Sequence, residues 1–258
     1  MTVWVDPPTW PAHGTVWSHV ISDTSLEELH AFARRAGIPA RSFEGDHYDI
    51  PAQRHGDVVA AGAAATTGRD LARRLARSGL RFRKRKGERP LGRYADALVA
   101  VGAPHTLDVI ASPLEPPASS GAAVVLVRDE RRIVLVRNES RAGWSPPGGK
   151  REAPETVRQA AVRELCEETG LLASPGELRP VGYERITVAP GHDTGIWSSS
   201  TPNHIAVFGT PARRSEPVTA SAEDVLEARW FAFRDARRLC GHEPWWLLIE
   251  GWFEGTSP

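Results

Sequence analysis

The segment from residue 149 to residue 171 is the most informative part of the chain, and it reads GKREAPETVRQAAVRELCEETGL. Thr156 and Gln159 have the spacing of a capping box, in which two side chains close the first turn of a helix reciprocally. We therefore expect a helix to begin near Val157. Gly170 suits the left-handed residue that ends many helices, because glycine adopts this conformation without steric cost. The segment predicts a helix about three turns long.

Three glutamates lie on one face of this predicted helix. Glu164, Glu167 and Glu168 stand at positions i, i+3 and i+4. Like charges at this spacing destabilise a helix by roughly a few tenths of a kcal/mol per pair. A bound cation explains why the sequence accepts them, and hard dications such as Mg²⁺ take oxygen ligands. The pattern predicts a metal site on this face.

The other positions of the helix leave two interpretations of the acidic face open. Val157, Ala161 and Leu165 form an adjacent apolar stripe, which predicts docking on a sheet with the carboxylates at the rim. A purely structural acidic face would instead be solvated and paired with Arg158 and Arg163. The sequence on either side of the helix favours the metal site.

This segment resembles the Nudix box. Gly149 is followed after five residues by Glu155, and after seven more by Arg-Glu-Leu-Cys-Glu-Glu-Thr-Gly-Leu, which matches that pattern at every specified position. The preceding Trp-Ser-Pro-Pro-Gly-Gly-Lys (144–150) and the later Glu-Ala-Arg-Trp-Phe (227–231) are also similar to the Nudix scaffold. The resemblance covers residues 121–254. It implies an α/β/α sandwich with a mixed sheet, a fold of the α+β class.

The resemblance also implies a reaction and roles for the residues of the box. Water attacks a phosphorus of the pyrophosphate in a nucleoside diphosphate linked to another moiety, and Mg²⁺ (or Mn²⁺) neutralises the phosphate charge. The implied metal ligands are Glu164, Glu167, Glu168 and the carbonyl of Gly148. Glu155 and Arg163 are implied to form a salt bridge that orients the loop and the helix. The implied catalytic residues are thus Glu164, Arg163 and Glu155.

The general base has three candidates. Glu164 is the default within the box, and Asp193 is a rival from the Gly/Ser-rich loop 190–202. His192 is the third, because an unperturbed histidine titrates near neutral pH. The alternative for both loop residues is ordinary solvated loop structure.

The substrate is not identified by the sequence. Trp144 and Trp197 are candidates for stacking on a base, with a hydrophobic plug beside the sheet as the alternative. Arg137 and Lys150 are candidates for holding phosphate as charged donors. We find no signature for ADP-ribose, NADH, coenzyme A or diadenosine polyphosphates, so a nucleotide is the expected partner without further detail.

Composition narrows the function classes. The chain has 258 residues, of which 41% are hydrophobic, with 32 basic and 32 acidic side chains. This profile predicts a soluble globular protein rather than a broadly basic nucleic-acid binder. Two cysteines without a CxxC pair argue against a disulfide framework and a zinc ribbon. No signal peptide and no apolar run of about 20 residues is visible, so we expect a cytoplasmic protein without a membrane partner.

The chain is predicted to hold two domains. Residues 1–90 carry 14 basic and 10 acidic side chains, against 18 and 22 in residues 91–258. We expect an N-terminal α/β domain over 1–90, a helix (94–101) with a Pro/Ser-rich linker (111–121) within 91–120, and the Nudix domain over 121–258. The other predicted helices cover residues 26–36, 67–78 and 244–253. The predicted strands cover residues 2–5, 122–127, 133–136, 181–188, 204–209 and 228–233.

The N-terminal half resembles an uncharacterised bacterial domain family of unknown function that is found ahead of Nudix domains. Its candidate metal or phosphate site consists of Asp6, His13, His19, Asp46 and His47. Capping and turn structure is the alternative for these residues, since their spacing matches no known zinc pattern. The basic run 81–86 permits nucleic-acid binding, which we do not expect. A nucleotide- or nucleic-acid-sensing regulator is therefore the alternative to an enzyme. The sequence does not predict the oligomeric state.

Overall fold

The computed structural model describes residues 2–139, 143–194, 197–212, 217–220, 222 and 224–253. The chain divides into two compact units, residues 1–84 and residues 85–258. Each unit has its own sheet and its own hydrophobic core. Within the described residues, no helix is both long enough and apolar enough to cross a membrane.

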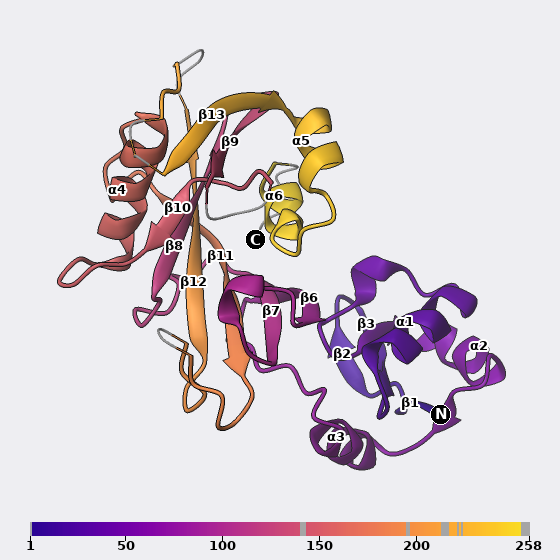
Figure 1. Ribbon diagram of the computed structural model, residues 1–258. Helices are drawn as coiled ribbons and strands as arrows, with labels where there is room; N and C mark the ends of the chain where they lie inside the picture. The colour runs from indigo at the N-terminus through magenta and orange to yellow at the C-terminus, as the bar shows by residue number, and fades with distance from the viewer. Residues whose placement is uncertain are drawn as a thin grey trace. The chain divides into compact units, whose positions relative to one another are not determined.

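The first unit is a five-stranded sheet with three α-helices (Figure 1). Its strands run in the order β2-β3-β1-β5. Strand β4 lies off this path and pairs with β3 as well. The strands are β1 (Val3–Val5), β2 (Trp10–Ala12), β3 (Thr15–Ser22), β4 (Tyr48–Pro51) and β5 (Ala64–Ala65). The helices are α1 (Leu26–Arg35), α2 (His55–Ala60) and α3 (Gly68–Arg77), with the short 3₁₀ turns η1 (Ala40–Ser42) and η2 (Ala52–Arg54).

Local signals explain the two longer helices of this unit. The side chain of Ser25 accepts a hydrogen bond from the backbone of Glu28 and caps α1, and Gly37 follows the helix with a φ of +65°. Thr67 caps α3 in the same way through Asp70. These caps satisfy N–H groups that a helix leaves unpaired at its start. The structure confirms the predicted helices at 26–36 and 67–78. It also confirms the predicted strand at 2–5.

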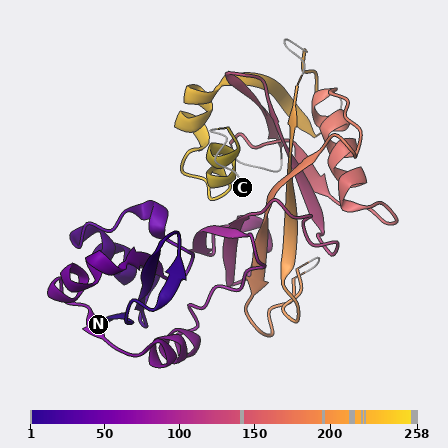
Figure 2. The same cartoon turned by 180° about the vertical axis from the view of Figure 1, so that it is seen from behind.

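The second unit is built on an eight-stranded mixed sheet (Figures 1 and 2). Its strands run in the order β13-β9-β8-β12-β11-β7-β6, with β10 paired to β8. The strands are β6 (Arg89–Ala95), β7 (His105–Ala111), β8 (Ala122–Arg128), β9 (Arg132–Asn138), β10 (Gly148–Lys150), β11 (Arg179–Val188), β12 (Asn203–Pro211) and β13 (Val225–Ala232). The helices are α4 (Val157–Thr169), α5 (Phe233–Cys240) and α6 (Trp246–Phe253), with the 3₁₀ turn η3 (Val99–Val101).

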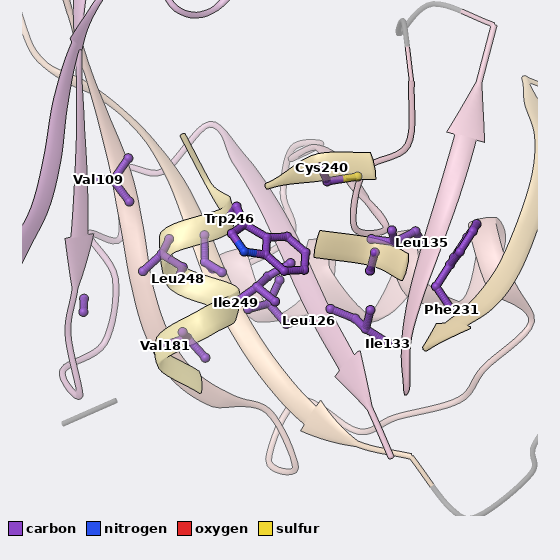
Figure 3. Close-up of a cluster of buried hydrophobic side chains, with 13 residues drawn as sticks. Val109, Leu126, Ile133, Leu135, Val181, Phe231, Cys240, Trp246, Leu248 and Ile249 are labelled. Atoms are coloured by element: carbon purple, nitrogen blue, oxygen red, sulfur yellow. The ribbon is translucent and has the colours of Figure 1, made fainter. Parts of the chain in front are cut away.

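Strand β8 shows how the sheet serves two helical layers. Ala123, Val125 and Val127 point to one face and pack with the buried residues of α4. Leu126 points to the other face and belongs to the cluster around Trp246 of α6, which Figure 3 shows in close-up. Because side chains alternate along a strand, one sheet can bury both faces. This arrangement is the α/β/α sandwich of the α+β class that the sequence predicts.

Two predictions for residues 91–121 are wrong. Residues 94–101 do not form a helix, because Tyr94 continues β6, which pairs with β7, and only η3 is helical. The Pro/Ser-rich residues 112–121 do not separate domains, because they join β7 to β8 within one sheet. The boundary between the two units falls at residues 84 and 85 instead. Long-range pairing with β7 overrides the local helical preference of residues 94 and 95.

The buried side chain of Asp108 shows what holds these additional strands. Arg93 on β6 donates to it at 2.6 Å and Arg185 on β11 donates to it at 2.6 Å. Asp108 on β7 is thus paired from both neighbouring strands. No signal near residue 94 could reveal this network, because its members are up to 92 positions apart in the sequence.

Candidate active site

The helix that carries the three glutamates is defined by its ends. Thr156 and Gln159 form the predicted capping box, and Gly170 closes α4 with a φ of +70°. Ala160, Ala161 and Leu165 are buried against the sheet. The packed face fixes the rotation of α4, so the acidic face lies along the rim of the sheet where the β10 segment passes it.

Arg163 is the centre of the ion-pair network on α4. Its guanidinium donates to both carboxylate oxygens of Glu155, at 2.8 and 3.2 Å, as the resemblance to the Nudix box implies for this pair. It also donates to Glu164 and to Glu167, each at 2.9 Å, and to the carbonyl of Lys150. The hydrogen bond from Arg163 lowers the pKa of Glu155 and, reciprocally, raises the pKa of Arg163. One planar side chain thereby ties the loop before α4 to two of the three glutamates.

Glu164 is the most enclosed of the groups paired with Arg163. Burial raises the pKa of its carboxyl, against the opposing effect of the neighbouring Arg163. The carboxylate passes directly over Gly149, where an added Cβ would lie 2.4 Å from Oε1. A side chain at position 149 would push this carboxylate aside, so the glycine leaves room for its present position.

Glu168 is held from the sheet side. Its Oε1 accepts a hydrogen bond from the amide of Asn138 at 2.7 Å, and its Oε2 accepts one from the backbone N–H of Gly148 at 2.7 Å. Gly148 must also be glycine, because an added Cβ would lie 2.4 Å from the carbonyl oxygen of Ala123. Each carboxylate oxygen has a second lone pair, so these bonds orient Glu168 without exhausting its capacity as a ligand.

Asn138 is a site residue that the sequence interpretation missed. It is the last residue of β9, and the available signal is a polar residue one position after Arg137, which follows the buried apolar run 133–136. Its Oδ1 is inaccessible to solvent and has no hydrogen-bond partner among the described residues. An unpaired buried acceptor of this kind costs about 1–3 kcal/mol. Such a cost is typical of a functional position, where a water or ligand completes the pairing.

The donor set of the three glutamates consists of carboxylate oxygens. Glu167 is exposed on 49% of its side chain, whereas Glu164 is 13% exposed and Glu168 is buried. Hard dications such as Mg²⁺ and Mn²⁺ prefer oxygen donors and keep open positions for water and phosphate. A set that grades from buried to exposed fits an ion held at the protein surface and open to a substrate.

The substrate candidates near the box differ in surroundings. Trp144 packs edge-on against Phe231 at 4.6 Å and joins the core cluster of α6, which fits the hydrophobic plug. Arg137 is exposed and pairs with Glu227 at 3.5 Å. The side chain of Lys150 is exposed, and its carbonyl accepts from Arg163. Arg137 and Lys150 are therefore accessible cations on the strands that flank the glutamates.

The loop between β11 and β12 is anchored to η3. The indole N–H of Trp197 donates to the carbonyl of Ala100, and the hydroxyl of Thr194 donates to the carbonyl of Val101. Asp193 accepts a hydrogen bond from the backbone of Ser199 within the same loop, which lowers its pKa. His192 is exposed. These contacts fix Trp197 against η3. The two base candidates of this loop, His192 and Asp193, are exposed to solvent.

Four of the five N-terminal candidates come together in the first unit. Asp6 Oδ2 lies 3.0 Å from Nδ1 of His19, and Asp46 Oδ1 lies 2.5 Å from Nδ1 of His47. His13 does not join them, because it occupies the turn between β2 and β3 with a φ of +50°.

Asp49, which the sequence interpretation omitted, completes this cluster. Its Oδ1 lies 3.3 Å from Nε2 of His47 and 3.8 Å from Nε2 of His19. Burial alone would lower the pKa of His47, but the carboxylates of Asp46 and Asp49 outweigh it and raise that pKa to about 9. The signal that could have found Asp49 is its position two residues after His47, on the same face of a strand.

The packing of Gly149 against Glu164 yields a testable prediction. Gly149→Ala is expected to lower turnover at the glutamate site by about tenfold or more, because the new methyl group displaces the Glu164 carboxylate. Gly176→Ala is the matched control, since no atom lies within 4 Å of its added Cβ. Initial rates and thermal unfolding of both variants would be compared. An unchanged rate in Gly149→Ala would show that the position of Glu164 is not critical.

Comparisons with known proteins identify both halves of the chain. Residues 118–247 match the family described as NUDIX domain, which is half of the chain. Residues 3–78 match a family described as protein of unknown function (DUF4031). Both resemblances inferred from the sequence are confirmed.

Several proteins with similar sequences are named as Nudix hydrolases or as hydrolases of RNA. An uncharacterized Nudix hydrolase of Bacillus subtilis is 34% identical over 114 residues, covering 44% of this chain and 66% of the relative. The m7GpppN-mRNA hydrolase NUDT17 of Danio rerio is 35% identical over 98 residues, covering 36% and 29%. The RNA pyrophosphohydrolase of Xanthomonas campestris is 41% identical over 64 residues, covering 22% and 31%. The chain thus spans less than two thirds of the length of each of these relatives.

Solved structures include distant similarities over the same half of the chain. The NUDIX domain of Shewanella oneidensis NrtR, complexed with ADP ribose, has a TM-score of 0.42 at 13% identity and covers 55% of this chain and 91% of its own. A Bacillus subtilis pyrophosphohydrolase has a TM-score of 0.38 at 21% identity, covering 49% and 72%. With the box, the sandwich and the family match over residues 118–247 in agreement, this chain belongs to the Nudix family.

Proposed function

We propose that this protein is a Mg²⁺-dependent pyrophosphohydrolase that cleaves the pyrophosphate linkage of a nucleoside diphosphate joined to another moiety. One observation carries the proposal. Glu164, Glu167 and Glu168 stand on one face of a packed helix, with Arg163 and the glycine segment fixing their positions. The names of relatives, which include an RNA pyrophosphohydrolase and a putative 8-oxo-dGTP diphosphatase, support the same class of reaction.

The metal would be held by Glu164, Glu167 and Glu168, with the carbonyl of Gly148 as a further ligand. When bound, Mg²⁺ (or Mn²⁺) supplies Lewis-acid polarisation of the phosphate and neutralises its charge. Arg163 keeps two of the carboxylates in place through its ion pairs, and Asn138 orients Glu168. Preorganised charge at the reacting phosphate is the main source of rate enhancement in phosphoryl transfer.

Glu164 is our candidate for the general base that takes the proton from the attacking water. It is carried by a rigid helix and lies beside the glycine segment rather than in a loop. Asp193 and His192 are the rivals, and their surroundings in the β11–β12 loop support them less well. A base must reach the water that it deprotonates, so its placement on a rigid element is an advantage.

The substrate contacts proposed from the sequence are Arg137, Lys150, Trp144 and Trp197. The exposure of Arg137 and Lys150 supports a role in holding phosphate oxygens by charge. Trp144 is half-buried and carries two guanidinium groups, those of Arg137 and Arg229, each 5.8 Å from its ring. These cations on the rim would favour an anionic ligand such as a nucleotide.

A substrate panel tests the proposal. The full chain would be incubated with ADP-ribose, NADH, dinucleoside polyphosphates, coenzyme A, 8-oxo-dGTP and 5′-triphosphorylated or capped RNA, with Mg²⁺, with Mn²⁺ and with a chelator. We expect hydrolysis of a phosphoanhydride bond that requires the metal. Binding of a nucleotide without turnover across the panel would instead identify a regulator that uses the Nudix scaffold for sensing. If DNA were its ligand, binding would weaken steeply with salt.

A further inference from the structure

The His/Asp cluster of the first unit has the composition and geometry of a metal site. We propose that this unit binds a first-row transition-metal dication of the Zn²⁺ type through Nε2 of His19, Nε2 of His47 and Oδ1 of Asp49. These three atoms all lie within 4.8 Å of one another. The inference rests only on residues 2–84, so it stands or falls separately from the proposed hydrolase activity.

The sheet itself brings the three groups together. His19 on β3 is the direct cross-strand partner of Asp49 on β4. Side chains at directly paired positions share one face of the sheet, with Cβ atoms about 5 Å apart. His47 precedes β4 and lies two residues before Asp49, so it shares the face with Asp49, while Tyr48 and Ile50 point into the core on the other side. The ligand set is thus defined by strand register rather than by a flexible loop.

Two buried carboxylates orient the imidazole rings. Asp6 pairs with Nδ1 of His19 and also accepts from its backbone N–H at 2.6 Å. Asp46 pairs with Nδ1 of His47 and accepts from the backbone N–H of Phe82. In the metal-bound form the proton on each Nδ1 would donate to its carboxylate, which leaves the two Nε2 lone pairs to bind the ion beside Asp49. Carboxylate–histidine pairs of this kind fix the tautomer and raise the basicity of metal ligands.

The distances between the ligand atoms suit a small dication. Oδ1 of Asp49 lies 3.3 Å from Nε2 of His47 and 3.8 Å from Nε2 of His19. Ligands at about 2.1 Å from a tetrahedral ion are roughly 3.4 Å apart. Oδ1 is also inaccessible to solvent and accepts no hydrogen bond from any described residue. A metal ion here would take the place of the ion pair that this oxygen makes with Nε2 of His47.

The charge of the cluster also favours a bound cation. Asp6, Asp46 and Asp49 contribute three negative charges around two imidazoles, and Asp6 and Asp46 are almost completely buried. Arg81, whose Nε lies 3.7 Å from Asp46, offsets one of them. When a bound metal takes the place of the Nε2 protons, the imidazoles are neutral and a charge of minus two is left, which one dication neutralises. Buried charges are costly unless they are paired in this way.

The donor types distinguish this ion from the one expected at the glutamates. Imidazole nitrogen suits Zn²⁺, Fe²⁺, Co²⁺ and Ni²⁺, whereas an all-oxygen set suits Mg²⁺. The side chains of His19 and Asp49 remain 24% and 35% exposed. Three protein ligands on a partly exposed face leave at least one coordination position for water or for an anionic ligand, which is the pattern of an open rather than a structural zinc site.

Metal titration of the full chain tests the proposal. The protein is stripped with a chelator and titrated with Co²⁺ in an excess of Mg²⁺, so that Mg²⁺ competes for the all-oxygen glutamates. We expect one equivalent of Co²⁺ with the visible absorption of nitrogen and oxygen ligands, displaced by Zn²⁺. His19→Gln and Asp49→Asn should lose this equivalent, and Asp6→Asn should weaken it about 10–100-fold. His13→Gln, an exposed histidine of the same unit, is the matched control.

A second measurement uses the unaltered chain, so the proposal can be tested even if the variants fail to fold. The ring nitrogens of ¹⁵N-labelled protein are recorded while Zn²⁺ is added. We expect the Nε2 signals of His19 and His47 to shift together and that of His13 to stay. The proposal is overturned if no equivalent of Co²⁺ binds, if binding survives both His19→Gln and Asp49→Asn, or if the Nε2 signals of His19 and His47 do not move.

Discussion

Replacing Glu167 by glutamine is expected to lower Mg²⁺-dependent phosphoanhydride hydrolysis by about 100-fold or more without unfolding the protein. The substitution keeps the size of the side chain but removes one of three negative charges proposed to hold the metal. Glu167 is half exposed, and its ion pair with Arg163 lies at the surface. Surface pairs contribute about 0–1 kcal/mol to stability, so the midpoint of thermal unfolding should change little.

The control for this prediction is Glu130→Gln, which alters an exposed glutamate in the turn between β8 and β9. Its rate and its thermal midpoint should equal those of the unaltered chain. Rates would be measured over a range of Mg²⁺ concentrations, since loss of a ligand should also raise the concentration needed for half-maximal activity. Full activity in both Glu167→Gln and Glu168→Gln would refute the assignment of these residues to a metal site.

Glu184→Gln is expected to stabilise the second unit above neutral pH. Glu184 lies in β11, is buried, and its Oε1 has no hydrogen-bond partner among the described residues. Burial, with a smaller contribution from Glu243, raises the pKa of its carboxyl from the ordinary 4.5 to about 7. Ionising such a group in the folded state costs on the order of 3 kcal/mol at a pH above both values. Glutamine keeps the shape and cannot ionise.

The pH dependence follows from proton linkage. Below pH 4.5 Glu184 is protonated in both the folded and the unfolded states, so it adds no penalty. Between pH 4.5 and about 7 the unfolded state loses its proton while the folded state keeps it, and stability falls as the pH rises. Above pH 7 both states are ionised and the penalty is constant. The advantage of Glu184→Gln should therefore grow across this window and then level off.

Urea unfolding at pH 5 and at pH 8 measures this effect. Six of the nine tryptophans belong to the second unit, so fluorescence reports mainly on its unfolding. The difference in free energy of unfolding between Glu184→Gln and the unaltered chain should be larger at pH 8 than at pH 5 by on the order of 2–3 kcal/mol. Glu130→Gln should show no such change. Equal differences at the two pH values would mean that Glu184 is ionised in the folded protein across the range.

Much of the catalytic half could be predicted because its signals are local. The capping box at Thr156 and the glycine at 170 each involve residues only a few positions apart. The spacing of the glutamates along a helix follows from its 3.6-residue period. By contrast, β6, β7 and α5 were not predicted. Their conformations depend on partners that are distant in sequence, such as the pairing of β7 with β11.

The site shows the same division. The ion pair between Glu155 and Arg163 was predicted from the resemblance and is present. Asn138 was missed, because its contact with Glu168 spans 30 positions and joins a strand end to a helix. Asp49 was missed although its neighbours His47 and Asp46 were included. Its place in the cluster is set by the register between β3 and β4, which no pattern in the sequence encodes directly.

By itself the sequence determined the Nudix box, its helix, the positions of three acidic side chains on one helical face, and the presence of a second domain. Those features depend on short-range geometry and on a pattern of residues that is read linearly. Only the tertiary structure decided that residues 85–120 belong to the catalytic unit, that Asn138 and Gly149 shape the acidic site, and that Asp49 joins two histidines in the first unit. Strand register and packing create these contacts, and both are properties of the folded chain.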